Sequence, residues 1–257
     1  MVTSDGKNRT IRLFCLNLRF GLADDGANGW AYRKQCYPDL LDGHPCDFYG
    51  FQEANDFQVS HLQRLLPEYG LIGQRRPAPD FWQNNVIFHH KRWKCLTKVH
   101  FYLSPTPDKP SKYPQSQWPR QCTMGLFQND AISIAVVNTH FDFKADVQRK
   151  SAMLILERLD RMAPNNPAVL MGDLNAGPDA DCVAVLTSGD GGFESALPPS
   201  SGGTYHGFSG LADGPPIDWI LFRGDLKKED ATVVTEQYAG RFPSDHFPLI
   251  ATFRLKI

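Results

Sequence analysis

The chain has 257 residues, of which 42% are hydrophobic and 17 are Phe, and its formal net charge at pH 7 is −1. This composition supports a sizeable core, and the near-zero charge excludes a molecule-wide attraction for nucleic acid or anionic membranes, although a local basic groove stays possible. No run of about 18 apolar residues exists, so neither a membrane span nor a stable membrane association is expected.

The termini and cysteines give little sign of special processing. Residues 1–10 are polar and lack the apolar stretch of a signal peptide, so we expect a flexible N-terminal extension on a cytoplasmic protein. The six cysteines are scattered, without a Cys-x-x-Cys pair or a His at zinc-finger spacing, which favours reduced and mostly buried thiols. The length allows one large domain or two small ones, and no obligatory protein partner is evident.

The predicted strands are short and numerous, and several are nearly continuous apolar runs, as in strands buried on both faces. In chain order we expect strands at residues 11–16, 47–51, 85–88, 132–137, 168–171, 217–222, 231–235 and 249–255. Pro- and Gly-rich stretches at residues 76–79, 104–119 and 197–216 predict loops, and the second is long enough to be functional or mobile.

Helical patterns are fewer than strand patterns. We expect helices at residues 30–41, 56–66, 145–162 and 179–186. The third pattern is the strongest because it places on one face Val147, Leu154, Ile155, Leu159 and Met162. Strands that alternate with helices early and follow one another late predict a two-sheet core with helices outside.

Polar residues of specialised types follow or begin the strongest strands. The set consists of Asn17, Glu53, His140, Asp173, Asn175, Asp218, Asp245 and His246. A rigid sheet fixes side chains at strand ends, while the adjoining loops admit a substrate. Asp218 is unusual because it lies within an apolar strand, where an unpaired carboxylate is costly, and a histidine is a natural partner for it.

This inventory is rich in oxygen ligands and contains no thiolate. Carboxylates, amides and water suit Mg²⁺ or Mn²⁺ rather than structural zinc. Together with neutral imidazoles they describe a site for a phosphate ester, where donors neutralise developing charge and a base activates water. Each residue alone also fits a turn, a cap, a surface charge or a core histidine, so the prediction depends on the whole set.

In this order the segments resemble the endonuclease/exonuclease/phosphatase superfamily, and within it the compact bacterial metal-dependent hydrolases. The matching segments are residues 15–21, 50–54, 137–142, 171–175, 217–220 and 243–248, and the resemblance spans residues 11–255. It implies a single α+β domain over residues 1–257, built as a four-layered αββα sandwich with the site at one end of the sheets. Most relatives carry a Gly-Glu pair before the strand at Val86. Here residues 82–85 read Trp-Gln-Asn-Asn, which puts any substrate contact of that Glu in doubt.

The resemblance also implies a metal site. Glu53 is the expected principal Mg²⁺ ligand, with help from Asn17 and Asp245, and Mn²⁺ is a possible substitute. Asn17 is expected to face the substrate phosphate as well.

The remaining members of the set receive catalytic roles from the same resemblance. Asp173 is expected to orient or deprotonate the attacking water, and Asn175 to hold a phosphate oxygen. His246, positioned by Asp218, is expected to contact the phosphate, and His140 to stabilise the transition state or serve as an acid. Whether Asp173 or the Asp218–His246 pair is the base stays open, because coupled groups blur a single assignment.

Three further side chains are candidates for contact with the substrate. Arg19 lies in the first matching segment. Arg149 lies near the start of the strongest helix, where a guanidinium can reach phosphate or simply face solvent. His206 lies in a Gly-rich loop.

The expected activity is hydrolysis of a P–O bond by in-line attack of an activated water. The near-zero charge slightly favours a small phosphoester, either a monoester or a diester. A metal-dependent endo- or exonuclease on DNA or RNA is the alternative, because residues 89–102 combine basic and aromatic side chains, although that stretch also fits the solvated edge of a hairpin. A non-catalytic scaffold on the same fold is a remote alternative, because none of the six matching segments has lost its polar residues.

Overall fold

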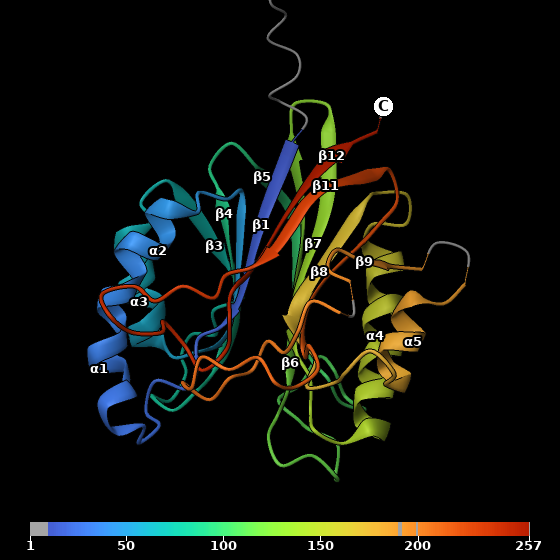
Figure 1. Cartoon of the computed structure of the whole chain (residues 1–257). Coiled ribbons are helices and arrows are strands. Elements are labelled where there is room, and N and C mark those ends of the chain that lie inside the picture. Colours follow the sequence, from blue (N-terminus) through green and yellow to red (C-terminus); the bar gives the residue numbers. More distant parts are fainter. Residues whose placement is uncertain (1–9, 190–191, 199, 257) are drawn as a thin grey trace, which may run out of the picture.

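Two six-stranded sheets pack face to face at the centre of the structure, and helices cover both outer faces (Figure 1). The computed structural model describes residues 10–189, 192–198 and 200–256. The first sheet has the strand order β11-β12-β1-β2-β4-β3, and the second has the order β5-β6-β7-β8-β10-β9. The predicted α+β sandwich of four layers is confirmed.

Each sheet is mixed, with one parallel pair among antiparallel neighbours. The first sheet contains β1 Thr10–Asn17, β2 Phe48–Ala54, β3 Tyr69–Ile72, β4 Asn84–His90, β11 Leu226–Val233 and β12 Leu249–Leu255. The second contains β5 Lys94–Tyr102, β6 Gln121–Asn129, β7 Ile132–His140, β8 Ala168–Asp173, β9 Glu194–Ser195 and β10 Asp218–Arg223. The parallel pairs are β1 with β2 and β7 with β8.

The helices divide between the two sheets. On the first sheet lie α1 Trp30–Arg33, α2 Tyr37–Gly43 and α3 Asp56–Leu65, and on the second lie α4 Ala145–Met162 and α5 Asp181–Thr187 (Figure 1). The single helix predicted at residues 30–41 is wrong, because a 3₁₀ turn at Lys34–Cys36 separates α1 from α2. Pro38 in the first turn of α2 explains the new start, since proline is tolerated there but not in a helix interior.

Several elements differ from the sequence-based expectation. Strands β3, β5, β6 and β9 were not predicted, and β11 begins at Leu226, before the predicted residue 231. Thr10 already belongs to β1, so the predicted extension is too long by one residue, and residues 1–9 lie outside the described part.

Residues 89–102 do not form a hairpin edge. Strand β4 ends at His90 in the first sheet, whereas β5 begins at Lys94 in the second. The connection therefore crosses between the sheets, and Trp93 is buried at the crossing. The segment mixes apolar and basic residues for two reasons. Trp93 packs in the interior where the chain crosses, whereas β5 is an edge strand in which several side chains face solvent.

Alternation along the strands builds the three apolar layers. In β1, Ile11, Leu13 and Cys15 pack between the sheets, while Phe14 and Leu16 face the helices of the first sheet. On the other side, the predicted apolar face of α4 packs on the second sheet. All six cysteines are free thiols, and five are buried. In the described part, no helix is both long and apolar enough to cross a bilayer.

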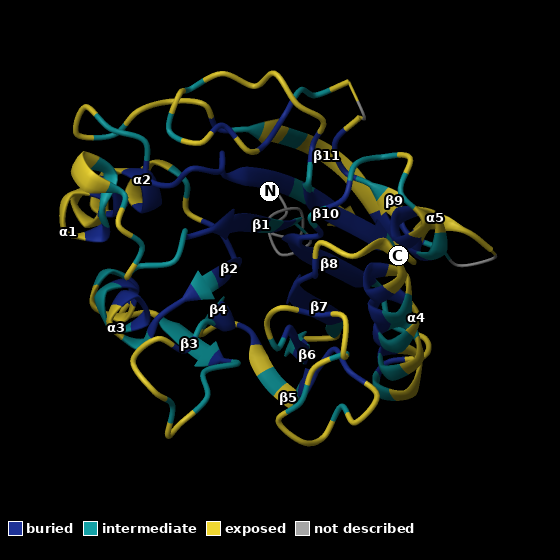
Figure 2. Cartoon of the chain, turned by 90° about the horizontal axis from the view of Figure 1, so that it is seen from below, coloured by how far each residue is buried: buried dark blue, intermediate teal, exposed yellow. Residues whose placement is uncertain are grey.

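The predicted polar set lies at one end of this sandwich. The carboxyl ends of β1, β2, β7 and β8 meet the amino ends of β10 and β12 at the lower end in Figure 1. Figure 2 looks at this end, where buried strands lie inside a ring of exposed loops. The sheets thus fix the floor of a site, and the loops form its rim.

Candidate active site

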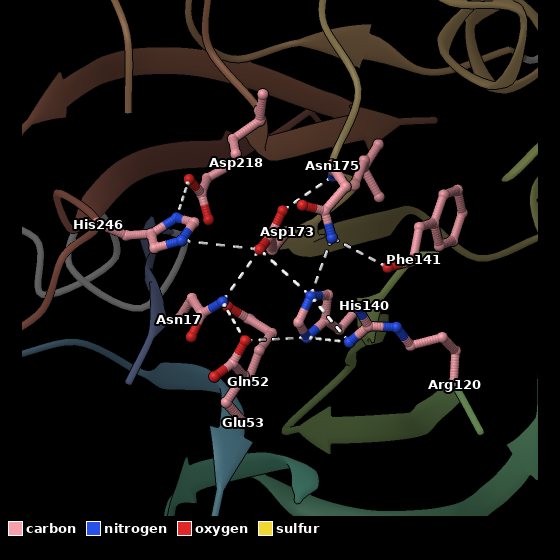
Figure 3. A network of polar contacts seen from close by, with 12 residues as sticks. Asn17, Gln52, Glu53, Arg120, His140, Phe141, Asp173, Asn175, Asp218 and His246 are labelled. Atoms are coloured by element: carbon pink, nitrogen blue, oxygen red, sulfur yellow. Dashed lines mark hydrogen bonds and ion pairs between the residues drawn. The ribbon is translucent and has the colours of Figure 1, made fainter. Parts of the chain in front are cut away.

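Asp173, the last residue of β8, is the centre of a buried polar network (Figure 3). Its Oδ2 accepts a hydrogen bond from Asn17 Nδ2 at 3.0 Å and lies 3.3 Å from His140 Nε2 and 3.9 Å from His246 Nε2. Its Oδ1 accepts from the backbone N–H of Asn175 at 2.8 Å. Segments far apart in the sequence therefore converge on one carboxylate, as the strand-end pattern predicts.

The backbone before Asp173 requires a glycine. A Cβ on Gly172 would lie 2.2 Å from the carbonyl oxygen of Thr139 in the neighbouring strand β7. This close approach brings the end of β8 against the end of β7, and it places Asp173 beside His140.

Asp218 has the histidine partner that its buried position requires. It pairs directly with Asp173 across β10 and β8, and its Oδ2 lies 2.8 Å from His246 Nδ1. Burial by itself lowers the pKa of His246, but the neighbouring carboxylates, Asp218 above all, raise it to about 10. His246 is therefore a cation at neutral pH and presents an N–H at Nε2 toward Asp173.

Glu53 reaches the site because β2 is irregular at its end. The pairing with β4 shifts between Phe51 and Ala54, and Glu53 adopts a positive φ of 57°. Such bulges re-aim side chains next to active sites. Its Oε2 accepts from the backbone N–H of Phe20 at 2.6 Å, and its Oε1 accepts from Asn17 Nδ2 at 3.2 Å.

His140 lies between Asp173 and a residue that the sequence did not single out. Arg120 Nη1 lies 3.1 Å from both ring nitrogens of His140, and Asn175 Nδ2 lies 3.0 Å from Nε2. Burial, followed by the charges of Arg120 and His246, holds the pKa of His140 well below its usual value. The imidazole is therefore neutral, and a role as an acid is disfavoured at neutral pH.

Asp245 lies at the opposite side of the network, close to Arg19. Its Oδ1 accepts from Ser244 Oγ at 3.1 Å, and its Oδ2 lies 3.6 Å from Arg19 Nε. The Arg19 guanidinium also donates two hydrogen bonds to Asp25, at 2.9 and 3.1 Å. Arg19 is thus anchored beside the site and keeps part of its side chain exposed.

A pocket of about 490 Å³ opens beside this floor. Arg19, Glu53, Arg120 and His140 line its polar base. The other lining residues are mainly aromatic or amide-bearing: Phe20, Phe81, Trp82, Gln83, Asn85, Trp118, Pro119, Gln121 and Phe143. A pocket of this size can hold an organic group while the polar base faces its phosphate.

This geometry agrees with a direct comparison of sequences. A sequence profile of the endonuclease/exonuclease/phosphatase family matches residues 15–246. The chain belongs to this family.

Several solved structures have the same architecture. An endonuclease/exonuclease/phosphatase from Bacteroides vulgatus superposes with a TM-score of 0.88 at 26% identity, over 96% of this chain and 99% of that one. A mannosyl-6-phosphatase from Bacteroides thetaiotaomicron gives 0.87 at 26% identity, over 95% and 99%. The human Nocturnin catalytic domain with bound sulfate gives 0.75 at 18% identity, over 97% and 94%, and supports the fold alone.

A curated relative is more distant. An uncharacterized protein of Acanthamoeba polyphaga mimivirus is 25% identical over 159 residues, which take in 57% of this chain and 59% of that protein. The chain therefore spans less than two thirds of the curated relative that it matches.

A divalent cation fits the chemistry of this family member's site. Ligand atoms of Asp173, Asp218 and His246 lie within 4.8 Å of one another. Among the described residues, buried Asp218 Oδ1 has no hydrogen-bond partner. Burial and the charge of Asp218 raise the pKa of Asp173 to about 7. A cation bound at these three residues would take the place of the proton that His246 carries without it, because a histidine ligates a metal only through an unprotonated ring nitrogen.

The predicted metal ligands form a different but adjacent set. Glu53 and Asn17 are in contact, and Asn17 bridges to Asp173. Asp245 is linked to the Asn17 backbone through Ser244 Oγ, which lies 2.6 Å from the Asn17 carbonyl oxygen and 3.1 Å from Asp245 Oδ1. The oxygen-rich donors suit Mg²⁺ or Mn²⁺, and the identity of the ion stays a prediction.

Two of the candidate substrate contacts lie apart from the pocket lining. Arg149 is exposed on α4, next to buried Gln148. His206 is buried and stacks on Phe247 with ring centroids 4.0 Å apart, while its Nδ1 accepts from the backbone N–H of Gly210. Burial lowers the pKa of His206 to about 4, so its ring is neutral and packs in the loop.

Two amides that received no predicted role connect the sheets behind the site. Gln52 Nε2 in β2 donates to Asn138 Oδ1 in β7 at 2.6 Å. Asn138 Nδ2 donates in turn to the carbonyl oxygens of Phe51 and Val86 in the first sheet. Gln52 directly precedes Glu53, and Asn138 lies two residues before His140. This closeness to predicted site residues is the one feature of the sequence that could have indicated a positioning role.

Proposed function

We propose that the chain is a Mg²⁺-dependent phosphoesterase that splits a P–O bond by in-line attack of water. The observation that carries this proposal is the convergence of Asp173 with the Asp218–His246 pair and Glu53 around one buried network. Membership of the family supports the same reaction class. The neutral His140 and cationic His246 add the mixture of donors that a phosphate group requires.

The metal would be held by the oxygen-rich side of the site. Glu53 is the proposed principal ligand, with Asn17 and Asp245, and Mn²⁺ can replace Mg²⁺. When bound, the ion supplies positive charge that stabilises the phosphoryl oxygens. The cluster of Asp173, Asp218 and His246 is the alternative location for an ion.

The pKa shifts favour Asp173 as the base rather than the Asp218–His246 pair. A carboxylate with a pKa of about 7 can accept a proton from water near neutral pH. The neighbouring carboxylates, Asp218 above all, raise the pKa of His246 to about 10, which favours a donor role for its ring. In the proposed step, the water oxygen bonds to phosphorus, its proton passes to Asp173, and the breaking P–O bond leaves its electron pair on the departing oxygen.

His246 then acts as a hydrogen-bond donor to the phosphate through Nε2, while Asp218 fixes the ring through Nδ1. The Asn175 backbone N–H donates to the Asp173 carboxylate, and the Asn175 side-chain amide lies against His140 Nε2, where it is proposed to hold a phosphate oxygen. Arg120, which the sequence did not single out, adds a guanidinium at the pocket base, where a planar donor suits phosphate oxygens.

A small phosphoester is the favoured substrate class. The pocket has room for a group of sugar or base size, and its aromatic walls offer flat apolar surface. A structure of similar fold and 26% identity is described as a mannosyl-6-phosphatase, which supports a phosphomonoester as the first class to assay. Gln83 lines the pocket in the segment where the family resemblance implies a Gly-Glu pair, so a substrate contact of that Glu is not expected here.

A nuclease is the second candidate, and three exposed aromatic side chains favour it. Phe81, Trp118 and Phe143 are 65%, 55% and 65% exposed around the pocket, as platforms for stacked bases are. Steep salt dependence of binding to single-stranded DNA or RNA would support this candidate, and absence of binding at low salt would exclude it.

The test is hydrolysis of p-nitrophenyl phosphate, a monoester, and of bis-p-nitrophenyl phosphate, a diester, with Mg²⁺ or Mn²⁺. We expect metal-dependent turnover by the wild type and its loss in Glu53→Ala and His246→Ala. The matched controls Glu68→Ala and His90→Ala remove the same residue types outside the network and should keep the wild-type rate. Equal metal-dependent rates in the wild type and both site variants would refute the proposal. A missing Mg²⁺-dependent thermal shift would favour a non-catalytic scaffold.

A further inference from the structure

A second hollow lies between the open edges of the two sheets. Strand β3 ends the first sheet and β5 begins the second, so both edges are free on this side. The hollow between them has a volume of about 570 Å³. Its lining consists of Leu71, Ile72, Gly73, Gln74, Arg75, Arg76, Lys98, Val99, His100 and Thr123. We call it the edge groove.

The edge groove is positively charged. Arg75, Arg76 and Lys98 line it, and its lining contains no carboxylate. Among the described residues, no carboxylate forms an ion pair with any of these three side chains. The Arg76 guanidinium donates to the neutral amide of Gln74 at 3.0 Å, and Gln74 donates in turn to the Asp56 carboxylate at 2.9 Å. Cations gathered in a hollow whose lining contains no carboxylate attract anions, and guanidinium groups suit phosphate in particular.

A thin partition separates the edge groove from the catalytic pocket. The Arg75 guanidinium lies over the Trp82 ring, 4.4 Å from its centroid, and Trp82 lines the pocket. Further along, Thr123 Oγ1 donates to the carbonyl oxygen of Asn85 at 2.6 Å, and Asn85 also lines the pocket. Gln121 in the pocket and Thr123 in the groove are two residues apart on β6, a rise of about 7 Å.

Gly73 keeps this partition thin. Its φ is +91°, and a Cβ there would lie 2.5 Å from both the Asn85 carbonyl oxygen and Thr123 Oγ1. Any larger residue would push the β3 end away from β4 and β6. The close approach thus leaves the two hollows on opposite sides of one thin wall.

We propose that the edge groove binds a second phosphate of the substrate, while the catalytic floor holds the phosphate that is cleaved. The inference rests on the proposed phosphoesterase function, because it treats the groove as an extension of the substrate site. The organic group between the two phosphates would occupy the aromatic pocket and cross the partition where Arg75 lies over Trp82. The ligand class is therefore a phosphoester with a further phosphate, either a small bisphosphate or the diester backbone of an oligonucleotide.

Binding of defined probes to the full chain tests this inference without turnover. Calorimetry in EDTA compares thymidine 5′-phosphate with thymidine 3′,5′-bisphosphate and with a thymidine tetranucleotide. We expect the wild type at low salt to bind at least one of the latter two about tenfold more tightly than the monophosphate, because one added phosphate contact has that order of effect. Arg76→Gln/Lys98→Gln should abolish this gain.

The control Arg64→Gln/Lys94→Gln removes the same charges outside the groove lining and should keep the gain. A gain only with the bisphosphate identifies a free phosphate as the ligand, whereas a gain only with the tetranucleotide identifies a diester backbone. No gain in the wild type with either probe, or an unchanged gain in the groove variant, would overturn the inference. Hydrolysis of bis-p-nitrophenyl phosphate, measured in parallel, reports separately on the proposed function.

Discussion

The catalytic floor and the pocket rim are built in opposite ways. Asp173 and Asp218 are 1% and 2% exposed and belong to strands, and neighbouring His246 is 6% exposed. Trp118 and Phe143 on the rim are 55% and 65% exposed and belong to loops. The contrast indicates that the sheets fix the chemistry while the loops choose the substrate, so substitutions in the two regions should alter different kinetic constants.

The largest effect is expected on the floor. His246→Ala should lower kcat on bis-p-nitrophenyl phosphate by about 10³-fold, because it removes a preorganised cationic donor. Asp218→Asn should lower kcat in the same direction, because the ring loses the carboxylate that holds it and raises its pKa. Steady-state kinetics with saturating Mg²⁺ measure both effects.

Thermal unfolding must accompany these assays, since loss of His246 leaves Asp218 buried without its partner. A folded His246→Ala variant with kcat within about tenfold of the wild type would show that this pair positions the loop and does not take part in the reaction.

Substitutions of two arginines compare a buried side chain at the pocket base with an exposed side chain outside the pocket. Arg120→Gln should lower kcat/KM by about 10²-fold, because a buried guanidinium at the pocket base is lost. Arg149→Gln should leave kcat/KM within about twofold, because that side chain is exposed on α4 and charge changes of this kind have small effects. Equal losses in the two variants would show that α4 approaches the substrate during turnover.

The smallest of these effects is expected on the rim. Trp118→Ala and Phe143→Ala should each raise KM about fivefold and leave kcat within about twofold, because stacking contributes about 1 kcal/mol to ground-state and transition-state binding alike. Tyr32→Ala, at an aromatic residue 51% exposed outside the pocket lining, is the matched control. A fall in kcat at constant KM would contradict the division between floor and rim.

The sequence predicted the floor because strand ends carry it. Asp173 and His246 adjoin apolar strands and lie in motifs of the family. The apolar runs predicted the strands, and the polar residues at the ends of these runs predicted the site. Arg120 escaped prediction because it follows a proline-rich loop and precedes β6, a strand without a strong apolar pattern. Its contact with His140 depends on tertiary packing alone.

The two other candidate contacts, Arg149 and His206, lie outside the pocket lining for different reasons. Val147 and Ser151 mark the buried face of α4, and Arg149, about 200° around the helix from Val147, points to solvent. His206 follows Tyr205, whose backbone pairs with that of His246, and its own ring turns into the apolar contact with Phe247. A loop without periodicity gives no means to foresee that direction.

The most direct test of one shared site is a double-mutant cycle of Glu53→Ala and His246→Ala on Mg²⁺-dependent hydrolysis of bis-p-nitrophenyl phosphate. We expect each single variant to lose at least about 10²-fold in kcat/KM, and the double variant to be no slower than the slower single variant, because residues that act as a unit are non-additive. Wild-type metal-dependent rates in either single variant would contradict the account.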